Sequence, residues 1–133
     1  MASINSRAKG ARGERELAEE FVKILGCDKE KTFRGCQFKG SKDSPDIVSD
    51  LEFIHPECKF VEHLNLYNAV EQAVRDSGPD QIPAVFHRKK RKPWLVIVRL
   101  DDLPKFVQKL ASRLAEREET TEEETESSED KQN

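Results

Sequence analysis

Residues 44–60, SPDIVSDLEFIHPECKF, place charged side chains in segments that otherwise look like β-strands ready to be buried. Asp46 begins one strand-like run, and Glu57 and Lys59 lie two residues apart in the next run. Side chains two apart in a strand leave the same face, roughly 7 Å apart at their bases. Cys58 then points to the opposite face, where a small apolar residue suits a core. If the two runs form neighbouring strands, Asp46 approaches Glu57.

Two carboxylates held close together repel each other unless a proton or a cation lies between them. A hard divalent ion such as Mg²⁺ suits such a place, because it prefers oxygen ligands and retains several of its waters. The same spacing also occurs on a surface strand that carries an ordinary Glu–Lys pair. Spacing alone therefore leaves a metal site and a solvated strand as alternatives.

Periodicity along the chain predicts eight elements. In order they are a helix at 6–25, strands at 31–35, 46–54 and 57–61, a helix at 66–77, strands at 82–87 and 93–100, and a helix that starts after 101–102. The last helix carries an apolar stripe that fits the helical period at every step: Leu103, Phe106, Val107, Leu110, Ala111 and Leu114. The order α-β-β-β-α-β-β-α predicts an α/β fold with a mixed central β-sheet flanked by helices.

Charge is distributed unevenly along the 133 residues. Residues 116–133 hold nine acidic and two basic side chains, a net charge of −7, whereas residues 1–115 hold 21 basic and 17 acidic ones, a net charge of +4. The length suits one compact domain. The sequence therefore predicts a single, mildly basic domain over 1–115, compatible with a polyanionic partner, and a disordered acidic tail over 116–133.

Several protein classes are disfavoured by composition. No stretch approaches the ~18 apolar residues of a membrane-spanning helix, and the N-terminus lacks the apolar region of a signal peptide. Three cysteines without CxxC spacing indicate neither a disulfide framework nor a zinc ribbon. We therefore expect a soluble, cytoplasmic protein with no membrane partner.

Glu14 stands out in the first predicted helix. At 100° per residue it falls in the middle of the arc defined by Leu17, Ala18, Phe21 and Leu25, so it is directed toward the sheet. Alternatively, the helix begins later and Glu14 is exposed. An inward acid, two strand carboxylates and a lysine form a coherent set for metal-assisted hydrolysis of a phosphodiester. The lysine would orient a water, help to deprotonate it, or neutralise the phosphate.

The segments Pro45-Asp46 and Glu57-Cys58-Lys59 resemble the motif of the PD-(D/E)xK nuclease superfamily, which implies a restriction-endonuclease-like core. The opening KGARGERELAEEF, residues 9–21, resembles the start of the archaeal-type Holliday junction resolvases, and later segments resemble their phage-borne relatives. Pro56 departs from a regular strand, because it cannot donate a hydrogen bond to a sheet ladder. The strand must therefore begin there, carry a bulge, or lie locally at an edge of the sheet.

The resemblance assigns roles to individual residues. It implies that Glu14, Asp46 and Glu57 bind Mg²⁺, for which Mn²⁺ substitutes, and that Lys59 is the catalytic lysine. It also implies a homodimer that cuts four-way junctions in a bacterial or phage-infected cell. Arg34 matches a basic residue that meets the DNA backbone in these resolvases. Ser41 lies in the loop where they carry a functional serine.

Basic side chains elsewhere predict contacts with DNA backbone. The N-terminal group is Arg7, Lys9, Arg12 and Arg15, and the run after the fourth strand is Arg88, Lys89, Lys90, Arg91 and Lys92. A solvated turn is the alternative for the run. Gln72, at the border of an apolar stripe, would contact DNA, support Lys59, or simply lie on the surface.

The function predicted from these features is that of a Mg²⁺-dependent, structure-selective endodeoxyribonuclease of the Holliday junction resolvase type. One alternative keeps the fold and the chemistry but changes the substrate to flaps, forks or duplex DNA. An alternative of another class is a DNA-binding module without catalytic activity, which the intact acids and lysine disfavour.

Overall fold

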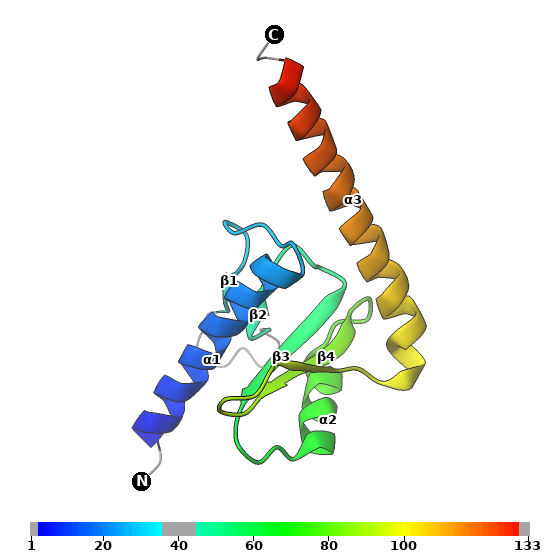
Figure 1. The fold of residues 1–133 in the computed structure, drawn as a ribbon. Helices are drawn as coiled ribbons and strands as arrows, with labels where there is room; N and C mark the ends of the chain where they lie inside the picture. Colours follow the sequence, from blue (N-terminus) through cyan, green and yellow to red (C-terminus); the bar gives the residue numbers. More distant parts are fainter. Residues whose placement is uncertain (1–2, 36–44, 131–133) are drawn as a thin grey trace.

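The computed structural model describes residues 3–35 and 45–130, with side chains for 7–35 and 45–119. The elements are α1 (Ser3–Ile24), β1 (Phe33–Arg34), β2 (Ile47–Val48), β3 (Ile54–Phe60), α2 (Leu66–Asp76), β4 (Ile82–Arg88), β5 (Leu95–Ile97), the 3-10 helix η1 (Leu100–Asp102) and α3 (Leu103–Asp130). Figure 1 shows α1 and α2 on either side of the strands, while α3 extends away from them. The predicted α/β class is confirmed.

The strands form two sheets. A short antiparallel pair joins β1 to β2, and a mixed three-stranded sheet has the order β3-β4-β5, with β3 parallel to β4 and β4 antiparallel to β5. The helix α2 makes the crossover between the two parallel strands, as parallel neighbours require. It begins at the cap Asn65, whose side chain accepts a hydrogen bond from the N–H of Asn68.

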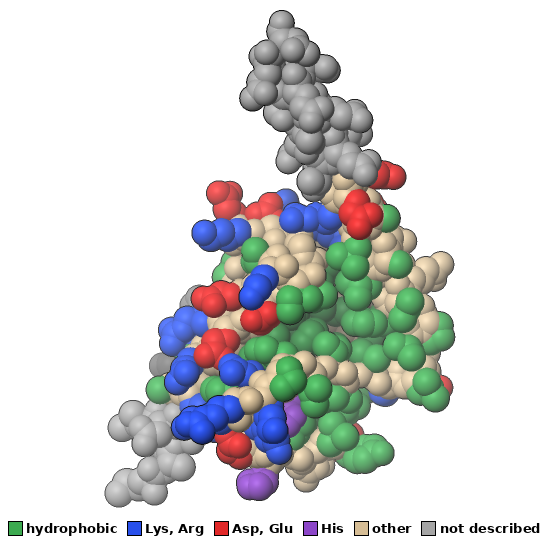
Figure 2. Space-filling view, in the orientation of Figure 1, with side chains coloured by type: hydrophobic (Ala, Val, Ile, Leu, Met, Phe, Trp, Pro, Cys, Tyr) green, Lys and Arg blue, Asp and Glu red, His purple; other side chains and the backbone are tan. Residues whose placement is uncertain are grey.

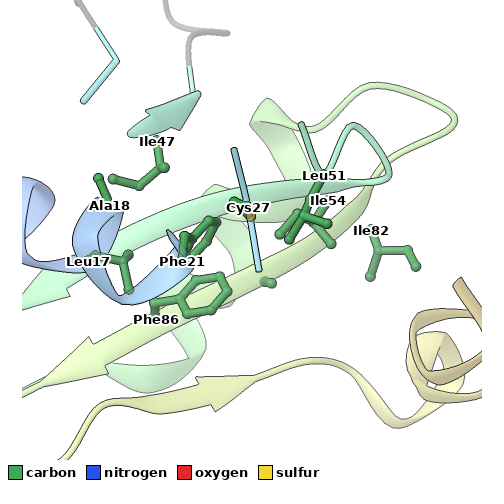
Figure 3. Close-up of a cluster of buried hydrophobic side chains, with 10 residues drawn as sticks. Leu17, Ala18, Phe21, Cys27, Ile47, Leu51, Ile54, Ile82 and Phe86 are labelled. Atoms are coloured by element: carbon green, nitrogen blue, oxygen red, sulfur yellow. The ribbon is translucent and has the colours of Figure 1, made fainter. Parts of the chain in front are cut away.

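The main core lies between α1 and the sheet. Leu17 and Phe21 on α1 are fully buried, and the ring of Phe21 packs against that of Phe86 on β4, with centroids 4.9 Å apart. Figure 3 shows these side chains meeting Ile47 of β2 and Ile54 of β3 in one cluster. A smaller cluster on the other face joins α2 to β4. The apolar arc predicted for the first helix is therefore its packing face.

Pro56 lies inside β3, which begins before residue 57, the predicted start of this strand. Of the three possibilities for Pro56, the structure supports the local edge. Its carbonyl accepts a hydrogen bond from the N–H of Asp46 at 3.3 Å, which shows that its backbone polar groups face the edge away from β4. No ladder bond to β4 is lost, because the missing N–H would have pointed to that same edge. The strand consequently begins at Ile54, a residue that the sequence assigns to the preceding strand.

The remaining differences concern the lengths and partners of elements. The strand predicted over 46–54 is reduced to β2, which pairs with β1 instead of forming a ladder with β3. The strand predicted over 93–100 is reduced to β5. At the C-terminus, α3 continues past residue 116 to Asp130, where a disordered tail was expected, since Glu is a good helix former. Among the described residues, no helix has the length and apolar content to cross a bilayer.

Close packing of α1 on β3 gives a first testable prediction. A Cβ added to Gly13 would lie 2.6 Å from Cβ of Phe60, an atom fixed to the backbone of β3. We expect Gly13→Ala to lower the free energy of unfolding by about 1–2 kcal/mol, because overpacking outweighs the gain in helix propensity. Urea denaturation would measure this change.

Gly10 on the same helix supplies a matched control, since an added Cβ meets nothing within 4 Å there. Gly10→Ala is expected to raise the free energy of unfolding by about 0.5–1 kcal/mol. Equal stabilisation by both substitutions would contradict the packing described for α1.

Candidate active site

Asp46 is held at the free edge of β3 by backbone hydrogen bonds. Its carbonyl accepts from the N–H of Gly35 at 2.8 Å, and its own N–H donates to Pro56. A Cβ on Gly35 would lie 2.1 Å from the carbonyl oxygen of Pro45, so only glycine permits this approach. The N–H of Cys58 donates to Oδ2 of Asp46 at 2.7 Å. The carboxyl group is therefore placed beside the strand that carries Glu57.

Asp46 and Glu57 form a buried pair of acids. Their exposed fractions are 8 % and 3 %. Burial raises the pKa of Asp46 from 3.8 to about 7, and the charge of Glu57 adds to this effect against the opposing hydrogen bond from Cys58. A side-chain hydrogen bond with Glu57 and the more distant charge of Glu14 raise the pKa of Asp46 further. The structure thus brings together the two strand carboxylates that the sequence singled out.

Glu14 on α1 completes the acidic group. Its side chain is mostly buried and pairs with the guanidinium of Arg34 on β1. It lies near enough to contribute to the raised pKa values of Asp46 and of the partly buried Cys58 thiol. The helical phase thus predicted the inward direction of Glu14. Arg34, predicted to meet DNA, is about half exposed and is engaged by Glu14.

His55 is a component that sequence reasoning did not assign to this site. It lies two residues before Glu57 on the same face of β3 and is only 1 % exposed. Its Nε2 is 3.4 Å from Oε1 of Glu57, which places an imidazole directly against the carboxylate. The two-residue spacing was a usable signal, because it puts both side chains on one face of a strand.

Lys59 continues this row of polar side chains along β3. Its ammonium group donates to Oε1 of Gln72 on α2, at 3.0 Å. Gln72 is neutral, so the contact orients the ammonium group while leaving its charge uncompensated by this partner. Of the three roles left open for Gln72 by the sequence, the structure supports contact with Lys59.

This contact gives a second prediction. If Lys59 acts on the phosphate, Gln72→Leu is expected to lower the cleavage rate by about 10- to 100-fold, because a hydrogen bond to a charged group is worth about 1.5–3 kcal/mol. Glu71→Gln, at an exposed position one residue away on α2, is the control and should cut at the wild-type rate. Single-turnover kinetics on a labelled DNA would compare them. Equal rates for Gln72→Leu and wild type would show that Lys59 does not need this support.

A cluster of cations and aromatic rings lies at the end of β3. Lys9 on α1 and Arg88 on β4 place their charges 5.3 and 5.5 Å from the ring centroid of Phe60, and Trp94 packs against the same ring. Arg88 also bonds to Glu16 at 2.6 Å. The structure therefore brings one member of each basic group predicted to bind DNA, Lys9 and Arg88, to the ring of Phe60, the residue after Lys59. Figure 2 shows blue side chains along this side of the molecule.

The other predicted DNA-binding residues are mostly on the surface. Those with exposed side chains are Arg7, Arg12, Arg15, Lys89, Lys90, Arg91 and Lys92. Arg12 pairs with Glu16 at 3.2 Å, and Arg91 occupies the turn with a positive φ of 66°. Ser41 lies outside the described residues, so its role stays a prediction.

The chemistry of the acidic group fits a divalent cation. Mg²⁺ is commonly held by one or two carboxylates together with waters and substrate phosphates. Asp46 and Glu57 supply the carboxylates, and burial together with the nearby charge of Glu57 raises the pKa of Asp46, so a cation between the two acids would stabilise their ionised forms. Within residues 3–35 and 45–130, no group of three or more His, Cys, Asp and Glu side chains is arranged as a ready metal site. Ligands from water and DNA would therefore complete the coordination.

A mixed α/β fold with paired acids at a strand edge, and a lysine two residues beyond the second acid, defines the PD-(D/E)xK class of nucleases. Within that class the chain belongs to a phage family, since residues 5–132 match the one described as "Phage putative PDDEXK endonuclease". No curated protein and no solved structure matches the chain. Family membership identifies an endonuclease and specifies neither a DNA structure nor a metal.

Proposed function

We propose that this protein is a divalent-cation-dependent endonuclease that cuts branched DNA, in particular four-way junctions. The observation that carries the proposal is the buried pair Asp46 and Glu57, with Glu14 near them and Lys59 two residues along β3. A buried acid whose pKa is raised by burial and by a neighbouring carboxylate, as for Asp46, favours a functional site over a structural one. Membership of an endonuclease family supports the same reading.

Asp46 and Glu57 would hold the cation, Mg²⁺ or Mn²⁺, with Glu14 as the third acid. The bound cation would polarise the phosphodiester, lower the pKa of a water and offset charge that develops in the transition state. His55 keeps the Glu57 carboxylate in place from the buried side, and the N–H of Cys58 does the same for Asp46. These contacts fix the orientation of the two carboxylates in the site where the cation would bind.

Lys59 would act on the phosphate or on the attacking water. Its ammonium is positioned by Gln72, a neutral partner, so the charge stays available to a phosphate oxygen. The cation and aromatic cluster around Phe60 would extend the contact along the DNA backbone. Such contacts are electrostatic and independent of sequence, as recognition of a branched structure requires.

The preference for four-way junctions rests on the opening of the chain. Residues 9–21 carry the resolvase-like opening, and Glu14 of that segment is close enough to Asp46 for its charge to raise the pKa of Asp46. Cutting a junction symmetrically takes two active sites, so we also propose a homodimer. The alternative with the strongest support is a nuclease of the same chemistry that acts on flaps, forks or duplex DNA.

The test uses a labelled four-way junction and a matched linear duplex, each incubated with protein in Mg²⁺ and in EDTA. Paired nicks near the branch point that disappear in EDTA would support the proposal. Equal cutting of the duplex would overturn the junction preference and support the general nuclease. Tight binding of the junction without cutting in Mg²⁺ or Mn²⁺ would overturn the enzymatic proposal and favour a DNA-binding module.

A further inference from the structure

The helix α3 is attached to the domain along only one of its sides. Near its start, Phe106 packs edge to face against Phe53, with centroids 6.3 Å apart. About two turns after Phe106, Arg113 pairs with Asp50. Beyond that point Figure 1 shows the helix projecting away from the sheets. A long helix gains little stability from propensity alone and depends on burying an apolar face.

Part of the apolar stripe of α3 has no cover in the described structure. Leu103, Val107 and Leu114 are 39, 54 and 37 % exposed, and Leu110 between them is half-buried. At 100° per residue these four side chains fall within about 60° of one another, beside the docked side of the helix. Figure 2 shows green side chains gathered on the side of the molecule where α3 lies.

The spacing of these four residues is symmetric. Leu103, Val107, Leu110 and Leu114 are separated by 4, 3 and 4 residues, so the stripe reads the same in both directions. If two copies pack with antiparallel α3 helices, Leu103 meets Leu114 of the other copy and Val107 meets Leu110. A two-fold interface requires such a self-complementary surface. Spacings of three and four residues are also those of helices packed side by side.

Charge favours the antiparallel orientation over the parallel one. The nine acidic and two basic residues from 116 onward begin directly after the stripe. In parallel helices these acidic segments would run side by side, at the 8–10 Å spacing of packed helices. In the antiparallel pair they leave at opposite ends, more than about 20 Å apart at their nearest, beyond the Debye length of about 8 Å.

We propose that α3 pairs in antiparallel orientation with α3 of a second copy of this chain, through Leu103, Val107, Leu110 and Leu114. The inference deepens the proposed function, because it identifies the surface that would join the two active sites needed at a junction. It is measured without DNA, so its failure would leave the proposed nuclease chemistry intact. Failure of cleavage would equally leave the pairing intact.

The test measures molar mass by analytical ultracentrifugation from about 1 to 100 µM protein. We expect wild type to reach twice the 15.3 kDa of the chain. Val107→Glu should weaken self-association by at least about 100-fold, since it places a charge in an apolar interface. Gln108→Glu makes the same change in charge at an exposed position about 100° around α3 from Val107, outside the stripe, and should associate like wild type. Circular dichroism and thermal denaturation would show that both variants remain folded.

Two results would overturn the inference. One is a wild-type chain that stays at 15.3 kDa throughout the concentration range. The other is a dimer that Val107→Glu and Gln108→Glu leave equally intact, which would place the interface elsewhere. Orientation is tested by mixing Leu103→Cys and Leu114→Cys chains under oxidation. Disulfides between positions 103 and 114 support antiparallel helices. Disulfides between two positions 114 in the mixture would support parallel helices and overturn the antiparallel orientation.

Discussion

Asp46→Asn is expected to abolish cation-dependent cleavage of DNA, lowering the single-turnover rate by at least about 10³-fold. Asn keeps the size of the side chain and an oxygen that can accept from the N–H of Cys58. It removes the negative charge shared with Glu57, and losing the cation costs several kcal/mol of transition-state stabilisation. The measurement is cleavage of a labelled junction, and of duplex DNA, at saturating Mg²⁺ and Mn²⁺.

Glu52→Gln is the matched control for this experiment. Glu52 is an exposed carboxylate just before β3, at the end of the strand opposite to Lys59. The control should cut at the wild-type rate, which would separate loss of the site from a general loss of negative charge. Cleavage by Asp46→Asn at more than about a tenth of the wild-type rate would remove Asp46 from the active site.

The same substitution, Asp46→Asn, also tests stability in the absence of metal. The pKa of Asp46 is about 7 in the folded protein and 3.8 as its ordinary value. A raised pKa means that the folded state favours the protonated carboxyl. The stability contributed by the protonated carboxyl of Asp46 is fully present below pH 4 and is lost as the pH rises through 7. The difference between the two values corresponds to about 4 kcal/mol as an order of magnitude.

Asp46→Asn is therefore expected to be more stable than wild type at pH 8 in EDTA, by up to about 4 kcal/mol, and close to wild type at pH 4. Urea denaturation at the two pH values measures the difference, with Glu52→Gln again as control. Addition of Mn²⁺ at pH 8 should raise the melting temperature of wild type and leave Asp46→Asn unchanged. If Asp46→Asn were less stable than wild type at pH 8, the result would contradict the burial of the Asp46 carboxyl and its repulsion by Glu57.

Prediction from sequence succeeded where a local period carried the information. The phase of α1 placed Leu17 and Phe21 in the core and Glu14 toward the sheet, and both follow from 100° per residue. The alternation of β3 likewise put Glu57 and Lys59 on one face. That face is the one α2 covers, as shown by the contact between Lys59 and Gln72.

Prediction failed where a residue's role depends on a distant segment. For Pro56 the sequence left a strand start, a bulge and a local edge open, and only the contact with Asp46 identifies the edge. His55 is of functional interest only because it is buried with its imidazole against the carboxylate of Glu57. The apolar stripe of the last helix follows from the helical period, but only the structure shows that it is covered in part.

The sequence by itself determined the types and order of the elements, the faces of α1 and β3, and the identity of the four chemical groups of the candidate site. Each of these depends on periodicity or residue type within one segment. Only the tertiary structure decided that β2 pairs with β1, that Asp46 sits on the edge of β3, and that its pKa rises to about 7. Strand pairing and burial arise from contacts between segments far apart in the chain, and no local pattern specifies them.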